Sequence, residues 1–334
     1  MKQNIFQEEL QNALIKLNSE VKTTNFKKAI IIMTTTQKIS QDLKIFPIRS
    51  VDKYICLPIA IKKIITAEKI IKFFDSQVEV FFIDIENKIK GCEDMLFKKK
   101  SLIKKAEIFQ IKSNDFTADS AFGFLSNYFI PLSKKKIFVI GSGNIGSKLA
   151  LKLVESGCNV FIKNSTKNST KKTVNAINVL KPKECSNKAV AILTKIPKMD
   201  CIISFTRGEV VIKPELVKIV NKRGLILDGG TGTISKDALE LANNLGLTIM
   251  RLDTRKGFET HAKLIIDTKT ILTEFYGSKK CGDFKIIAGG FIGNLGDIVV
   301  DNIKNSKKIF GVADGNGKLL HNTHKFSKNL ELVR

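Results

Sequence analysis

A glycine-rich turn between an apolar run and a stretch of helical period carries the clearest chemical signal. Residues 136–146 read Lys-Ile-Phe-Val-Ile-Gly-Ser-Gly-Asn-Ile-Gly, and apolar residues at helical spacing follow. In such a turn Gly141 permits the sharp bend, Gly143 lets the backbone approach a pyrophosphate, and Gly146 lets the helix pack closely on the strand. The free N–H groups at the helix start attract an anion. We therefore predict a dinucleotide site, with a purely structural turn as the alternative. Its predicted contacts are Gly141, Ser142, Gly143, Asn144, Ile145 and Gly146.

The end of the next apolar run bears on the choice between the two nicotinamide cofactors. An acidic residue at this point binds the ribose 2′-hydroxyl of NAD. Here no Asp or Glu follows Ile162 until Glu184. The residues in its place are Lys163, Asn164, Ser165, Thr166 and Lys167. Because lysine and hydroxyl groups suit a 2′-phosphate, the sequence favours NADP(H) over NAD(H), unless the two lysines are simply surface residues.

Two later apolar runs, 199–205 and 225–228, end in short polar or glycine-containing turns. Polar groups at the carboxyl ends of parallel strands line the ligand cleft in folds of this kind. We therefore predict further cofactor contacts, although a plain strand-to-helix turn fits the same residues. These candidates are Ser204, Thr206, Arg207, Asp228 and Gly229.

Apolar runs of strand length alternate with helical stretches along most of the chain. This alternation predicts an α/β fold with parallel sheets. We expect an N-terminal α/β substrate or catalytic domain over 1–129 and a doubly wound Rossmann NAD(P)-binding domain over 130–256. Residues 257–334 are expected to form C-terminal helices that return to the first domain, and a hairpin that turns at 313–318.

Several segments resemble the shikimate dehydrogenase family. Residues 114–125, just ahead of the glycine turn, resemble its Asn-Thr-Asp-x-x-Gly-Phe motif, and 164–166 resemble its Asn-Arg-Thr. The resemblance extends over about residues 112–277. It implies an amino-acid-dehydrogenase-like N-terminal domain, a Rossmann domain and NAD(P)-dependent dehydrogenase activity. The substrate-binding motifs of that family are replaced here, which implies a different substrate.

The same resemblance implies that Asp119 binds substrate and shares a proton with a lysine. In that family the lysine lies in an Asn-Val-Thr-x-Pro-x-Lys motif, and residues 56–63 are its nearest counterpart here. Lys62 and Lys63 are therefore the candidate partners of Asp119, since a carboxylate beside a lysine tunes the proton donor. The alternatives are a helix N-cap for Asp119 and solvent-exposed positions for both lysines.

Composition narrows the class of protein. The chain has 334 residues, of which 43% are apolar and 26% charged, as in ordinary globular proteins of about two domains. Lys and Arg total 56 against 32 Asp and Glu, a net charge of +24. Only six of the basic residues are Arg, the residue preferred for phosphate and base recognition. The charge therefore favours a small anionic ligand and disfavours a nucleic-acid partner.

The remaining features predict a reduced, cytoplasmic protein that binds neither a metal nor a membrane. The six cysteines are scattered, no Cys/His spacing is typical of zinc, and no apolar run is long enough to span a bilayer. An oligomer is compatible with the sequence.

The combined hypothesis is an NADP-dependent oxidoreductase that acts on a small anionic metabolite. Three alternatives remain open. The first is a non-catalytic dinucleotide-binding sensor or regulatory protein, and the second is a basic protein associated with nucleic acid. The third is a glutamyl-tRNA-reductase-like enzyme, which needs Cys56 or Cys92 as a nucleophile.

Overall fold

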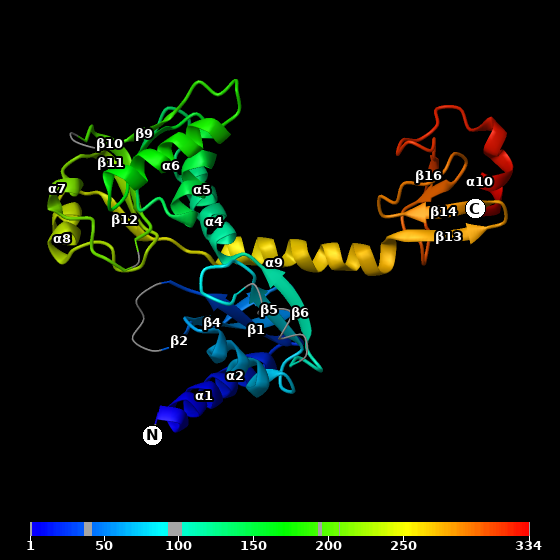
Figure 1. Cartoon of the computed structure of the whole chain (residues 1–334), viewed down its shortest axis with the longest axis horizontal. Helices are drawn as coiled ribbons and strands as arrows, with labels where there is room; N and C mark the ends of the chain where they lie inside the picture. Colours follow the sequence, from blue (N-terminus) through cyan, green and yellow to red (C-terminus); the bar gives the residue numbers. More distant parts are fainter. Residues whose placement is uncertain (1, 37–41, 93–101, 193–195, 207, 334) are drawn as a thin grey trace. The chain divides into compact units, whose positions relative to one another are not determined.

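The computed structural model in Figure 1 divides the chain into two compact units, Met1–His261 and Ala262–Arg334. The residues that the structure describes are 2–36, 42–92, 102–192, 196–206 and 208–333.

The first unit begins with a mixed sheet of strand order β2-β4-β1-β5-β6, in which β3 also pairs with β4. Its parallel strands are β1 (Lys27–Thr34), β4 (Tyr54–Ile61), β5 (Val80–Asp84) and β6 (Glu107–Ile111). The short strands β2 (Leu43–Ile45) and β3 (Arg49–Val51) run antiparallel to successive parts of β4. Every residue of β4 is buried, as in a strand that is covered on both faces.

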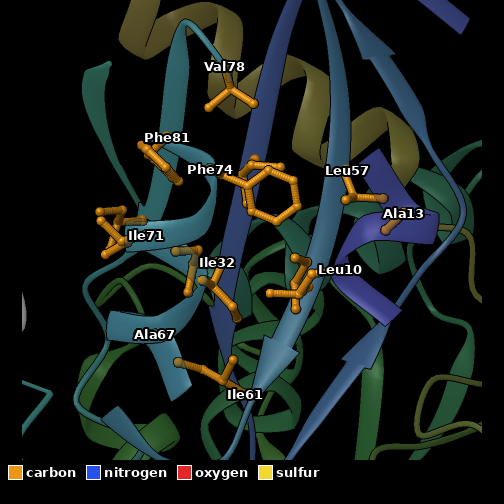
Figure 2. Packing of buried hydrophobic residues seen from close by; sticks show 14 of the residues in the cluster. Leu10, Ala13, Ile32, Leu57, Ile61, Ala67, Ile71, Phe74, Val78 and Phe81 are labelled. Atoms are coloured by element: carbon orange, nitrogen blue, oxygen red, sulfur yellow. The ribbon is translucent and has the colours of Figure 1, made fainter. Parts of the chain in front are cut away.

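Helices α1 (Lys2–Lys22) and α2 (Ile64–Phe74) pack their apolar faces on this sheet. Figure 2 shows side chains from both helices meeting side chains of the strands in one cluster. Leu10 and Ala13 come from α1, Ile71 and Phe74 from α2, and Ile32 and Leu57 from the strands. Burial of this apolar surface is the main force that holds the helices on the sheet.

The second sheet of the first unit has strand order β12-β11-β10-β7-β8-β9, and all of its strand pairs are parallel. Its strands are β7 (Lys136–Ile140), β8 (Asn159–Lys163), β9 (Ala189–Ala191), β10 (Met199–Ser204), β11 (Val220–Asp228) and β12 (Thr248–Arg251). Counted along the chain, this is the 3-2-1-4-5-6 order of a Rossmann fold. The predicted α/β architecture with a doubly wound sheet is therefore confirmed.

Helices complete the layers around the second sheet and connect it to the first. They are α4 (Ser113–Tyr128), α5 (Asn144–Glu155), α6 (Lys167–Leu180), α7 (Pro214–Val217), α8 (Lys236–Asn244) and α9 (Arg255–Thr270). Phe258 of α9 lies edge-on to Phe116 of α4 and Phe82 of β5, with ring centroids 5.7 and 5.6 Å apart. The start of α9 is therefore anchored on both α4 and the first sheet.

The second unit contains a four-stranded sheet of order β13-β14-β15-β16. Its strands are β13 (Gly277–Cys281), β14 (Phe284–Ala288), β15 (Ile298–Val300) and β16 (Ile309–Val312). The sequence interpretation anticipated β16 and the turn at 313–318, where Asp314 Oδ1 accepts hydrogen bonds from the N–H groups of Asn316 and Lys318 at 2.7 and 3.0 Å. The strands β13 to β15 were not predicted, and β13 carries exposed lysines instead of alternating apolar residues.

Three short helical elements complete the second unit: η1 (Ile271–Phe275), which directly follows α9, η2 (His324–Phe326) and α10 (Ser327–Val333). Within the described part of the chain, none of the helices combines the length and the apolar character needed to cross a membrane.

Candidate functional site

The glycine turn lies between β7 and α5, and each of its three glycines meets a different geometric need. Gly141 adopts φ +83°, a left-handed conformation that other residues rarely take. A Cβ atom on Gly146 would lie 2.5 Å from the carbonyl oxygen of Gly141, so only glycine permits this close packing of helix on turn. A Cβ atom on Gly143 would meet nothing within 4 Å. The backbone at Gly143 therefore faces open space in front of the helix start, which fits the approach of a pyrophosphate.

Asn164, which directly follows β8, stabilises this turn through hydrogen bonds. Its Oδ1 atom accepts hydrogen bonds from the backbone N–H of Ser142 at 2.7 Å and from the Ser142 hydroxyl at 2.9 Å. The backbone N–H of Gly141 donates to the carbonyl oxygen of Lys163 at 2.9 Å. Ser142 and Asn164 therefore hold the shape of the turn, whereas Asn144 is exposed at the start of α5 and Ile145 lines the cavity described below.

The residues predicted to meet a 2′-phosphate follow β8 directly. Lys163, Ser165 and Lys167 are exposed beside the turn. Thr166 is the N-cap of α6, because its hydroxyl oxygen accepts a hydrogen bond from the backbone N–H of Ser169 at 3.1 Å. Both predicted lysines thus lie at the same edge of the sheet as the glycine turn, with their side chains in solvent.

The turns after β10 and β11 lie against each other. Ser204 is fully buried, and its hydroxyl contacts the hydroxyl of Thr233. The carboxylate of Asp228 accepts hydrogen bonds from the N–H groups of Gly230 and Gly232 at 3.1 and 2.7 Å, and from the Thr233 hydroxyl at 2.9 Å. Ser204 and Asp228, which were predicted as cofactor contacts, therefore stabilise the two turns. Thr206 and Gly229 line the cavity, and Arg207 lies outside the described residues.

A cavity of about 470 Å³ joins the carboxyl ends of the two sheets of the first unit. The first sheet and α4 contribute Thr34, Lys88 and Ser113, and the Rossmann sheet and its helices contribute Ile145, Thr206 and Gly229. A larger hollow of about 1090 Å³ is lined by α1 and the β2 region and by no residue of the Rossmann sheet. The smaller cavity is therefore the candidate site, since ligands of such folds bind beyond the carboxyl ends of the strands.

Lys88 is the most unusual side chain in this cavity. Its Nζ atom lies 2.6 Å from Asp84 Oδ2 and 3.2 Å from Glu86 Oε2, and it also contacts the hydroxyl of Ser113. The side chain of Lys88 is 14% exposed, and those of Asp84 and Glu86 are 0% and 7% exposed. Two buried carboxylates thereby hold the ammonium group of Lys88 at the cavity wall.

Lys88 was not among the predicted site residues, because it lies in an Asn-Lys-Ile-Lys segment that is typical of a solvated surface. A signal was nevertheless present. The apolar run 78–85 has strand length and contains Asp84 near its end, and Glu86 and Lys88 follow at alternate positions. Charged residues that directly follow a buried parallel strand lie at the ligand-binding edge of the sheet.

A second lysine connects this group to the glycine turn. Lys148 of α5 lies 3.2 Å from Glu86 Oε1 and also pairs with Asp115 of α4. Partial burial opposes ionisation of Asp115, but hydrogen bonds from Lys148 and Lys112 outweigh it and lower the pKa of that carboxyl. The helix that begins at the glycine turn is thereby tied to the carboxylates around Lys88.

Asp119 belongs to a different cluster. It lies within α4, which begins at Ser113, so it is not a helix N-cap. Its Oδ1 atom lies 2.9 Å from Nζ of Lys152, and its Oδ2 atom lies 2.6 Å from Nε2 of His261. The structure does not bring it together with the lysines that the sequence suggested. Lys63 pairs with Asp42 at 3.0 Å, and neither it nor Lys62 is among the described residues that line the cavity.

We expect the stability contributed by Asp119 to change in the acid range. Partial burial raises the pKa of Asp119, but hydrogen bonds from Lys152 and His261 outweigh it and hold that pKa below its ordinary value of 3.8. A carboxyl with a lowered folded-state pKa stabilises the fold above 3.8 and loses this effect as the pH falls through the folded-state pKa. The Asp119→Asn variant should therefore be less stable than wild type at neutral pH. In chemical unfolding the difference should shrink below pH 3.8, and a constant difference would contradict this assignment.

The described cysteines and metal-ligating residues add little chemistry. All six cysteines are unpaired. Burial raises the pKa of Cys56 and Cys92, which disfavours the thiolate that a nucleophile requires. Over the ranges that the structure describes, no group of three or more His, Cys, Asp or Glu side chains could hold a metal ion.

Comparisons with known proteins agree with the geometry of the second sheet. Residues 136–250 match the family model described as the NAD binding domain of 6-phosphogluconate dehydrogenase. The prediction of a dinucleotide-binding Rossmann domain is therefore confirmed. No curated protein sequence matches the chain.

Three solved structures illustrate what the chain is similar to. One is a shikimate dehydrogenase in complex with NADP+, which is 15% identical and has a TM-score of 0.45, over 72% of this chain and 96% of that chain. The second is the shikimate dehydrogenase of Aquifex aeolicus, at 16% identity and a TM-score of 0.44, over 72% and 94% of the two chains. The third is the 5-ketofructose reductase of a Gluconobacter species, at 14% identity and a TM-score of 0.44, over the same shares.

Proposed function

We propose that the protein is an NADP-dependent oxidoreductase that interconverts a carbonyl or imine group and its reduced form on a small anionic metabolite. The observation that carries this proposal is the cavity in which Lys88, flanked by two buried carboxylates, faces the turns of a dinucleotide-binding sheet. Residues 1–129 would supply the substrate side of this cavity and residues 130–256 the cofactor side.

The residues around the glycine turn fit a nicotinamide dinucleotide. The open space in front of Gly143 and the N–H groups at the start of α5 would receive the pyrophosphate. The exposed groups of Lys163, Ser165 and Lys167 would meet a 2′-phosphate, which is the basis for proposing NADP(H) over NAD(H). When bound, the cofactor supplies or accepts the hydride, and the protein must position the substrate and manage one proton.

Lys88 is the proposed proton carrier. Its Nζ atom would donate a proton to the oxygen or nitrogen of the substrate during reduction and recover it in the reverse direction. Asp84 and Glu86 orient the ammonium group, and the Ser113 hydroxyl contacts it as well. The cluster of Asp119, Lys152 and His261 is assigned a role in holding α4, α5 and α9 together.

The first test is a fluorescence titration of NADPH and NADH into the purified protein and its Gly143→Asp variant. A carboxylate at this position adds negative charge where a pyrophosphate would lie, so we expect NADPH binding to weaken at least about tenfold, or about 1.4 kcal/mol. Gly143→Asn is the matched control, because it has the same shape without the charge and the same capacity to cap a helix. The chain contains no Trp, so protein emission interferes little with the nicotinamide signal.

The outcomes separate the proposals. NADPH binding that is lost in the Asp variant and kept in the Asn variant supports the cofactor site. A preference for NADH would contradict the assignment of 163–167 to a 2′-phosphate. Absence of binding by folded wild-type protein would overturn the oxidoreductase proposal. Turnover of any carbonyl substrate would exclude the alternative of a non-catalytic sensor.

A further inference from the structure

Two arginines from different sheets line the candidate cavity. Arg49 is the first residue of β3 in the first sheet, and Arg251 is the last residue of β12 in the Rossmann sheet. The chain has only six arginines among its 56 basic residues. A cavity that contains two of them therefore differs from the lysine-rich surface of the protein.

Arg49 is a partly desolvated cation at the cavity wall. Within the described ranges, no Asp or Glu lies at ion-pair distance from its guanidinium. Burial lowers the pKa of Arg49, and the nearby charge of Asp253 only partly opposes this effect. Asp253 is already engaged, since Nε of Arg255 lies 2.8 Å from its Oδ2 atom. An anion that approaches such a cation stabilises it.

Arg251 lies away from the expected position of the cofactor's phosphates. In the sheet order β12-β11-β10-β7-β8-β9, the glycine turn follows β7 and the 163–167 segment follows β8. Arg251 is the last residue of β12, an outer strand that lies on the other side of β7 from β8. It is therefore placed to meet a molecule that extends beyond the nicotinamide end of the cofactor.

We infer that Arg49 and Arg251 together bind an anionic group of the substrate, a carboxylate or a phosphate, while its reacting carbon faces Lys88. This inference rests on the proposed function. A guanidinium presents two parallel N–H donors that match the oxygens of either group, which lysine cannot do. Thr254 lines the same cavity, and its hydroxyl can donate a further hydrogen bond to such a group.

The test is isothermal titration of malonate and, separately, of inorganic phosphate into the full-length protein saturated with NADPH. NADPH occupies the glycine turn, so phosphate bound there does not contribute to the signal. The variants are Arg49→Gln and Arg251→Gln. Arg223→Gln is the matched control, because Arg223 is exposed on β11, does not line the cavity and carries the same charge.

We expect each cavity variant to weaken anion binding by at least about tenfold, which is the low end of a charge-assisted hydrogen bond. The control should bind as wild type does. Tighter binding of malonate identifies a carboxylate site and tighter binding of phosphate a phosphate site, and both support the inference. Equal affinity in wild type and both cavity variants would overturn it, as would absence of binding of either anion to wild type. Since NADPH binding is measured in the same samples, failure of the cofactor site remains distinguishable from failure of this inference.

Discussion

Replacing Lys88 by Met should destabilise the protein by about 3–5 kcal/mol, because it leaves the fully buried carboxylate of Asp84 without its cation. The same change should lower turnover at least about 100-fold, which is typical when a positioned proton donor is lost. NADPH affinity should change little, since the glycine turn is held by Asn164 and by the backbone of β8. Chemical unfolding followed by circular dichroism measures the first effect, and NADPH oxidation with any substrate that wild type reduces measures the second.

Two further variants separate stability from chemistry at this position. Lys88→Arg keeps the positive charge but cannot release a proton near neutral pH, so it should retain more stability than the Met variant and still lack turnover. Lys90→Met removes an exposed lysine two positions away and should change stability by no more than about 0.5 kcal/mol. Full turnover in Lys88→Arg would refute the proposed role of Lys88.

Gly257→Ala should destabilise the protein by about 1–2 kcal/mol, the excess of overpacking over the gain in helix propensity. A Cβ atom at this position in α9 would lie 2.3 Å from the carbonyl oxygen of Phe116 and 2.1 Å from the hydroxyl oxygen of Ser120. The Phe116 oxygen is backbone within α4 and already accepts a hydrogen bond from Ser120 at 2.7 Å, so the helices must move apart. Overpacking of this kind outweighs the gain in helix propensity of about 1 kcal/mol.

The matched control is the same substitution at Gly123 of α4. A Cβ atom on Gly123 would meet nothing within 4 Å, so Gly123→Ala should stabilise the protein by up to about 1 kcal/mol. Urea unfolding of both variants provides the comparison. Equal changes in the free energy of unfolding of the two variants would show that the close approach of α9 to α4 does not disfavour alanine at position 257.

Local pattern was sufficient to predict the Rossmann sheet. The strands at 137–140, 160–162 and 225–228 are short, continuous apolar runs, and the structure places them within β7, β8 and β11. The glycine turn was predictable because the backbone permits only glycine at Gly141 and Gly146. In this part of the chain each residue's local preference agrees with the final fold.

The strand β4 was not predicted, although all of its residues are buried. Its apolar run contains Pro58, and a proline argues against a central strand because it lacks a backbone donor. In the structure, Pro58 lies where the pairing of β4 changes from β2 to β3. Ile45 pairs with Ile59 and Arg49 pairs with Cys56, so Pro58 lies next to the break between the two short strands. This arrangement depends on long-range pairing that a local pattern does not contain.

The candidate proton carrier was missed for a related reason. Lys88 becomes distinctive only through its contacts with Asp84, Glu86 and Ser113, and Ser113 belongs to a separate element of the fold. For Asp119, the sequence motif suggested a lysine partner at position 62 or 63, whereas the structure pairs it with other residues. Its partners Lys152 and His261 come from α5 and α9, which lie far along the chain. Residue type indicated the chemistry, but the pairing depends on how the helices pack.

The loop 229–233 is already ordered before a ligand binds. The carboxylate of Asp228 accepts hydrogen bonds from backbone N–H groups and a hydroxyl group of this loop in the folded protein. Fixing a flexible residue costs about 1–2 kcal/mol of conformational entropy. For these residues that entropy is lost during folding. A ligand that contacts Gly229 or Thr231 therefore meets a preorganised wall, and its affinity is not reduced by an ordering penalty on that side of the cavity.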